Sequence, residues 1–220
     1  MQKMACDCCG TCCRKGGPAL HTEDRRLVET GVLGLGDLIT IRRGEYVLQP
    51  LTDKPLPAKE EFLKIQGKGT DWCCKFLDNE LSTCTIYSNR PLACRLLKCW
   101  DTDDVLAVAG RELLNRFSLV PENNPVYSLM KKHDDECPVP DLTSLNTQLS
   151  EKKYRDDTLA TLTGLVNRDL QIRLYTAKKF HLSIADELFC FGRPIFQLLV
   201  RVGISVTESA EGLTLQYSGT

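Results

Sequence analysis

The chain has 220 residues, and its 28 Lys and Arg nearly balance its 29 Asp and Glu, for a formal net charge of −1. A chain of this length can bury a hydrophobic core as one domain or two small ones, and a charge this close to zero argues against a nucleic-acid-binding protein. Since the sequence contains no signal-peptide pattern and no apolar run near the roughly 20 residues that cross a bilayer, we expect a cytoplasmic protein that does not bind membranes.

The first hundred residues are predicted to consist of short elements. A helix is expected from Thr22 to Thr30, because threonine is a helix-capping residue type. Pro91 suits the first turn of another short helix, which would carry Cys94 and Cys99. Strands are predicted at 38–41, 46–48, 62–65, 72–77 and 82–87, the first two as a β-hairpin and the last two around a turn at 78–80.

The second half is predicted to be mainly helical. Asp103 or Asp104 can cap a helix whose apolar positions continue to Phe117, and four prolines between 121 and 140 are expected to interrupt the chain. Apolar residues three and four apart predict a long helix over 150–179. Further predicted elements are a helical stretch from Leu182, a helix start at Pro194, and a terminal hairpin of 204–206 with 213–217.

These elements predict an α+β fold in two parts. Residues 1–102 would form a small irregular cysteine domain of short strands and helices, held together by metal. Residues 103–220 would form a mainly helical region, ending in the hairpin, whose function the sequence does not identify.

Cysteine is the residue type that points to a function. Twelve cysteines make up about 5% of the chain, below the roughly 8–10% that is typical of disulfide scaffolds. In a reducing compartment, clustered cysteines more often bind metal or do redox work than form disulfides. Metal binding is therefore the favoured interpretation, with thiol redox chemistry and an exported, oxidised protein as alternatives.

Eight of the cysteines fall into two groups of four. Two intervening residues, as between Cys9 and Cys12, allow two sulfurs to face one ion, and four thiolates at roughly 2.3 Å complete a tetrahedral zinc site. Neighbouring Cys12 and Cys13 are expected to point in different directions, so that the two groups interleave and share two centres. The first group is Cys6, Cys9, Cys12 and Cys13, and the second is Cys74, Cys84, Cys94 and Cys99.

The spacing leaves the identity of the metal open. Cys6-x2-Cys9-x2-Cys12 reproduces the first three positions of a bacterial iron–sulfur run, but the x3-Cys-Pro continuation is absent. A set of four cysteines suits structural zinc equally well. We favour zinc, with iron or a 4Fe-4S cluster as the alternative.

The arrangement of all eight cysteines, together with Ile86-Tyr87-x2-Arg90-Pro91-x2-Cys94-Arg95, resembles the YkgJ-type cysteine-cluster family over about residues 5 to 102. The module of that family is described as a zinc- or iron-chelating CxxCxxCC domain. The resemblance implies that the eight grouped cysteines are the metal ligands. Lys98 departs from the pattern, because we expect a proline just before the last cysteine. The family also includes a module attached to flagellin lysine N-methylase, so part of a protein-modifying enzyme is an alternative function.

Several further residues have two interpretations each. Cys8 and Cys73 adjoin pattern cysteines and are either spare ligands or bystanders, with the register open by one residue. Arg90 and Arg95 either fix the helix or offset thiolate charge. The remaining candidates are Cys137 as a ninth ligand or a free loop thiol, Cys190 as a buried apolar side chain, and His21 as the best-placed histidine ligand.

The sequence thus predicts a metal-binding protein with a structural or accessory role. No nucleophile elbow, P-loop, GxGxxG or HExxH motif occurs, so we predict no catalytic residue and lean against an enzyme. The helical half is expected to serve an unidentified protein partner. The alternatives are an iron–sulfur redox protein and a lysine methylase-like enzyme or its accessory.

Overall fold

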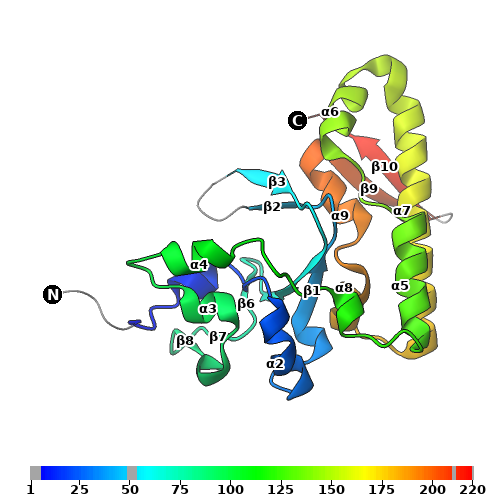
Figure 1. The fold of residues 1–220 in the computed structure, drawn as a ribbon. Helices are drawn as coiled ribbons and strands as arrows, with labels where there is room; N and C mark the ends of the chain where they lie inside the picture. The colour runs from blue at the N-terminus through cyan, green and yellow to red at the C-terminus, as the bar shows by residue number, and fades with distance from the viewer. Residues whose placement is uncertain (1–5, 49–53, 210–211, 220) are drawn as a thin grey trace.

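The computed structural model describes residues 6–48, 54–209 and 212–219, and it confirms the α+β fold class (Figure 1). Its N-terminal part consists of short helices and two-stranded antiparallel sheets. The helices are α1 (Thr11–Arg14), α2 (Arg25–Glu29), α3 (Leu92–Leu96) and α4 (Asp103–Val108). The strand pairs are β1 (Leu38–Ile41) with β4 (Phe62–Ile65), β2 (Tyr46–Leu48) with β3 (Pro55–Pro57), β5 (Gly67–Lys68) with β6 (Cys73–Cys74), and β7 (Leu77–Asp78) with β8 (Thr83–Cys84).

The C-terminal part is mainly helical and ends in a hairpin, as the sequence predicts. None of the helices in the described ranges is both long and apolar enough to cross a membrane. The elements are α5 (Pro125–Glu136), α6 (Leu142–Ser150), α7 (Lys152–Phe180), α8 (Ile184–Phe191), α9 (Ile195–Leu199), and the paired strands β9 (Ile204–Ser209) and β10 (Gly212–Tyr217).

The predicted hairpin of 38–41 with 46–48 is wrong. β1 instead pairs with β4, with Ile39 opposite Lys64, and β2 pairs with β3. The reason lies in the connecting turn, where the Arg42 side chain is buried and donates from Nη2 to the carbonyl oxygen of Cys137. This contact draws the turn into the helical half, so the chain leaves β1 in a new direction.

Two helix predictions also need correction. The helix that begins at Asp103 ends at Val108, because the Leu114 backbone pairs with Leu20 and Leu63 on either side (N···O 2.9 and 2.8 Å). The stretch containing Pro125 is not irregular but begins α5. Proline is tolerated in the first turn of a helix, where its missing N–H has no partner to lose.

The hydrophobic core is continuous across the two predicted parts. It includes Leu63 and Ile65 of β4 together with Val166 of α7 and Phe189 of α8. α8 packs against β1, where the Thr40 hydroxyl donates to the Phe189 carbonyl oxygen at 2.5 Å. The boundary predicted at residue 102 remains a prediction, although the core spans it.

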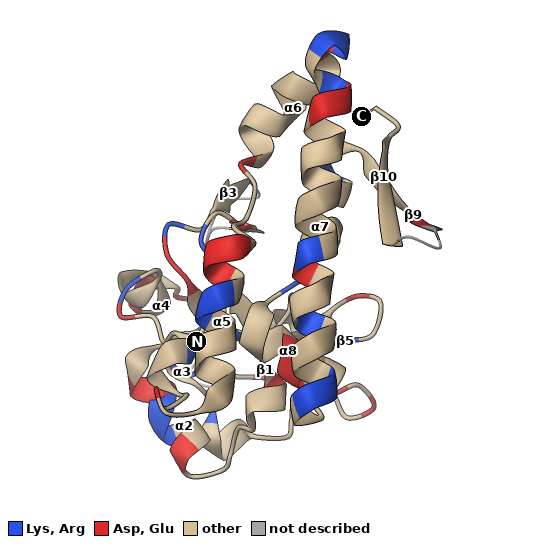
Figure 2. Ribbon diagram, turned by 90° about the vertical axis from the view of Figure 1, so that its right-hand side faces the viewer, with Lys and Arg blue, Asp and Glu red and all other residues tan. Residues whose placement is uncertain are grey.

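A buried ionic cluster joins α5, α7 and the start of α9. α5 runs beside α7, and charged residues recur along both helices (Figure 2). The fully buried Asp169 carboxylate accepts hydrogen bonds from His133 Nε2 (2.6 Å), Arg173 Nε (2.7 Å) and the Ile195 amide (2.8 Å). Burial lowers the pKa of His133 to about 4, so this imidazole is neutral at physiological pH. The cluster therefore ties three helices together through one carboxylate.

Candidate metal centre

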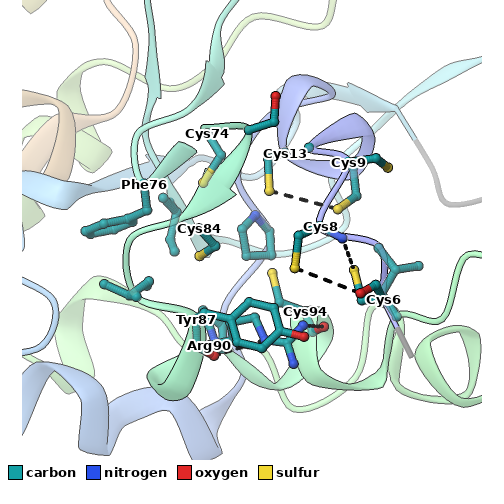
Figure 3. Close-up of a pocket in the computed structure, with 18 of the residues that line it drawn as sticks. Cys6, Cys8, Cys9, Cys13, Cys74, Phe76, Cys84, Tyr87, Arg90 and Cys94 are labelled. Carbon is teal, nitrogen blue, oxygen red and sulfur yellow. Dashed lines mark hydrogen bonds between the residues drawn. The ribbon is translucent and has the colours of Figure 1, made fainter. Parts of the chain in front are cut away.

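Nine cysteines from both ends of the N-terminal part line a single cavity of about 60 Å³, which we call the thiol pocket (Figure 3). All eight ligand candidates predicted from the sequence are among them, and Cys8 is the ninth. Cys74 is buried, whereas Cys9, Cys12 and Cys99 are exposed. The full set is Cys6, Cys8, Cys9, Cys12, Cys13, Cys74, Cys84, Cys94 and Cys99.

The first group reaches the pocket through α1. Gly10, which precedes this helix, has a left-handed backbone (φ 71°) that glycine adopts without a steric penalty. Its carbonyl oxygen accepts from the Arg14 amide at 2.9 Å, closing one helical turn that carries Cys12 and Cys13. α1 lies against β6, so these sulfurs come next to Cys74 of the second group.

The second group comes from the two short ribbons, from α3, which carries Cys94, and from the segment after α3, which carries Cys99. Cys74 lies opposite Gly67 in the β5–β6 ribbon, and Cys84 lies opposite Leu77 in the β7–β8 ribbon. Gly67 must be small, because a Cβ there would come within 2.5 Å of the Trp72 ring. Both ribbons therefore present one cysteine each to the same cavity.

Asp24 positions the helix that carries Cys94, and sequence reasoning missed this role. The Asp24 side chain is fully buried, and its Oδ1 accepts from the Leu92 amide at the start of α3 (2.8 Å). Its Oδ2 accepts from the His21 amide at 2.9 Å. No local pattern points to this contact, because the two partners are 68 residues apart.

The prediction that Cys12 and Cys13 point in different directions is wrong, since their sulfurs lie 3.9 Å apart. Tetrahedral coordination with Zn–S bonds of about 2.3 Å separates two sulfurs by about 3.8 Å. Both thiols can therefore bind the same ion. Across residues 6–48, 54–209 and 212–219, no three Cys, His, Asp or Glu side chains already form a coordination site. The fit to a metal accordingly rests on the soft donor set and its shared cavity.

Three thiols of the pocket, those of Cys13, Cys74 and Cys94, favour their protonated form when no cation is near. Burial raises the pKa of Cys13 to about 12, with a further contribution from Cys12. Burial also raises the pKa of Cys74 and of Cys94, and neighbouring thiols add to both increases. A bound cation reverses this balance, because metal ligation requires the thiolate. Metal binding here is therefore a displacement of protons by a cation.

Zinc binding is expected to release protons and to become tighter as pH rises. Because the pKa values of Cys13, Cys74 and Cys94 are raised, protons compete with zinc for these thiols throughout the neutral range, and the competition weakens as the pH increases towards those values. Calorimetric titration of metal-free, reduced protein in two buffers of different ionisation enthalpy measures the number of protons released. Cys190→Ser, which removes a buried thiol outside the pocket, is the matched control and should release the same number. Equal binding enthalpies in the two buffers would contradict the prediction.

Arg90 and Arg95 differ in their surroundings. The Arg90 guanidinium lies over the Tyr87 ring (3.9 Å to the centroid) and donates from Nε to the Tyr87 carbonyl oxygen at 3.1 Å. Arg90 and Tyr87 both line the thiol pocket, so Arg90 is placed to offset thiolate charge. Arg95 instead forms an ion pair with Glu23. Its interactions fit the alternative of fixing the helix.

The other candidate ligands do not line the thiol pocket and lie in other surroundings. Cys73 is buried, with its sulfur 3.5 Å from the Lys68 carbonyl oxygen. Cys137 is fully buried at the end of α5, and Cys190 is buried in α8 as the sequence predicts. The His21 ring nitrogen Nδ1 lies 2.9 Å from the Arg111 carbonyl oxygen.

Residues 5–112 match the family model CxxCxxCC, whose description is "Putative zinc- or iron-chelating domain". Searches of curated proteins and of solved structures found no match. The matched segment contains every residue that lines the thiol pocket.

Proposed function

Because residues 5–112 belong to the CxxCxxCC family, we propose that the thiol pocket holds zinc through the eight grouped cysteines in two four-cysteine centres. The observation that supports this most strongly is the convergence of both cysteine groups on one cavity, although up to 93 residues separate their members in sequence (Cys6 to Cys99). Thiolates are soft ligands that select zinc, copper(I) and iron–sulfur clusters over hard cations.

The proposed role of the metal is structural. Between residues 67 and 113, only Cys73, Cys74, Leu77 and Pro91 are buried. So few buried side chains cannot offset the conformational entropy of ordering this segment. Bound zinc would supply the missing free energy, as it does in small zinc domains. The folded domain, joined through the continuous core to the helical half, would then present that half to a protein partner.

An iron–sulfur cluster is the second candidate. It is supported by the Cys6-x2-Cys9-x2-Cys12 spacing and by the apolar side chains of Ile65, Phe76 and Ile86, which line the pocket beside the sulfurs. An apolar surrounding limits solvent access and tunes the reduction potential of such a cluster. In this case the protein would carry electrons or assist a modifying enzyme.

Metal and sulfide analysis of one anaerobic preparation tests the proposal. We expect a colourless protein with about two zinc ions per chain, the number that eight thiolates can hold in four-coordinate sites. Cys74→Ser should lose zinc, because Cys74 faces the pocket, whereas Cys73→Ser, its neighbour outside the pocket, should retain it. Iron with acid-labile sulfide in a brown protein would overturn zinc in favour of the cluster, and a protein without bound metal would overturn both.

A further inference from the structure

The thiol pocket contains one sulfur more than the proposed centres need. Cys8 is the surplus residue, and Figure 3 shows its sulfur directed into the pocket, between Cys6 and the side where Cys94 lies. Cys73, the other cysteine next to a ligand candidate, instead lies with its sulfur near the Lys68 carbonyl oxygen. The two extra thiols are therefore not equivalent, and Cys8 alone of this pair lines the pocket.

Cys6 and Cys8 are held close together by the local backbone. Cys8 has a left-handed backbone (φ 51°), which is uncommon for a residue other than glycine. In this conformation the Cys8 amide donates to Cys6 Sγ at 3.4 Å, and Cys8 Sγ lies 3.9 Å from the Cys6 carbonyl oxygen. Both side chains are half-buried. The two thiols therefore lie close together on one three-residue segment at the pocket.

The wall of the pocket that Cys8 lines includes an aromatic and a basic side chain. Tyr87 and Arg90 line the same pocket as Cys8, and the Arg90 guanidinium stacks on the Tyr87 ring at 3.9 Å. The contact of the Cys8 sulfur with the Cys6 carbonyl oxygen places this thiol at the pocket beside Cys6. Cys8 is thus kept within reach of the position that Cys6 occupies.

We propose that Cys6 and Cys8 are alternative ligands for one coordination position. This inference rests on the proposed function of the pocket. In the exchange, a bond from Cys8 sulfur to the metal forms as the bond from Cys6 sulfur breaks, and the proton lost by the Cys8 thiol is taken up by Cys6. Charge and oxidation state do not change, so no further reactant is needed. The exchange would keep the position filled throughout, because one thiolate binds as the other is released.

Zinc content in four variants tests this alternation. We expect Cys6→Ser and Cys8→Ser each to retain the zinc content of the unmodified protein, because the remaining thiol fills the position. The double variant Cys6→Ser/Cys8→Ser should lose about one zinc per chain, since a tetrahedral site then lacks a ligand. The double variant Cys6→Ser/Cys73→Ser is the matched control and should retain its zinc, because Cys8 is still present.

Other outcomes separate the alternation from the proposed function. Loss of zinc from Cys6→Ser alone, or from Cys8→Ser alone, would overturn the alternation while leaving a zinc-binding protein. Retention of all zinc by the Cys6→Ser/Cys8→Ser variant would do the same. An unmodified protein without zinc would overturn the proposed function itself.

Alkylation of the unmodified, zinc-loaded protein tests the same point without relying on the folding of any variant. N-ethylmaleimide should label the segment that contains Cys6 and Cys8 once, with the label found on Cys6 in some molecules and on Cys8 in others. Tandem mass spectrometry locates the label. A label on only one of the two residues, or on both in the same molecule, would overturn the alternation.

Discussion

Removal of the proposed metal by a chelator is expected to unfold residues 6–16 and 67–102 while the helical half remains folded. The reason is the distribution of buried side chains: only four residues are buried between 67 and 113, whereas α7 alone buries six, among them Val166 and Ile172. Structural zinc contributes on the order of 10 kcal/mol to the folding of small zinc domains. Because residues 67–113 bury only four side chains, loss of this contribution should be decisive in that segment.

Hydrogen exchange followed by mass spectrometry measures this effect. Amides in 67–102 should lose protection after chelation, whereas amides in α7 should keep it and serve as the internal reference. Adding zinc back under reducing conditions should restore protection in 67–102. Unchanged exchange in this segment, or equal loss of protection in α7, would contradict a metal that holds only the cysteine domain together.

Asp169→Asn is expected to lower the free energy of unfolding by about 3–5 kcal/mol. Asp169 is fully buried and accepts from His133, Arg173 and the backbone of Ile195. The asparagine is nearly the same size but uncharged, so the buried Arg173 guanidinium would lose its counter-charge. An unpaired charge in the interior costs far more than an exposed ion pair contributes.

Urea denaturation of Asp169→Asn, compared with Asp157→Asn, measures this cost. Asp157 lies on the same helix but is exposed, so its substitution should change the free energy of unfolding by less than about 0.5 kcal/mol. Equal effects of the two substitutions would show that the buried cluster contributes no more to the free energy of unfolding than an exposed carboxylate does.

The acid limit of this stabilisation follows from the pKa of Asp169. Burial alone would raise this pKa, but the hydrogen bond from His133 and the charge of Arg173 lower it below its ordinary value of 3.8. The stabilisation is therefore complete above pH 3.8 and is lost as the pH falls through the lowered value. The difference between the unmodified protein and Asp169→Asn should accordingly shrink only in strong acid.

The sequence alone identified the features that depend on local pattern and composition. Apolar residues at helical spacing predicted the long helix α7, and the strand pattern near the C-terminus predicted the β9–β10 hairpin. The spacing of the cysteines selected eight of the nine thiols that line one cavity. Each of these signals lies within a short stretch or in a characteristic residue type, so it survives without knowledge of the fold. The role of the eight thiols as metal ligands stays a prediction.

The tertiary structure decided which distant segments meet. β1 pairs with β4 rather than with its neighbour in sequence, because the buried Arg42 draws the turn into the helical half. Asp24 reaches the start of α3 from 68 residues away, and the Cys12 and Cys13 sulfurs face each other within one turn of helix. Long-range pairing, buried charge and side-chain direction depend on the whole packed chain, and local sequence patterns do not record them.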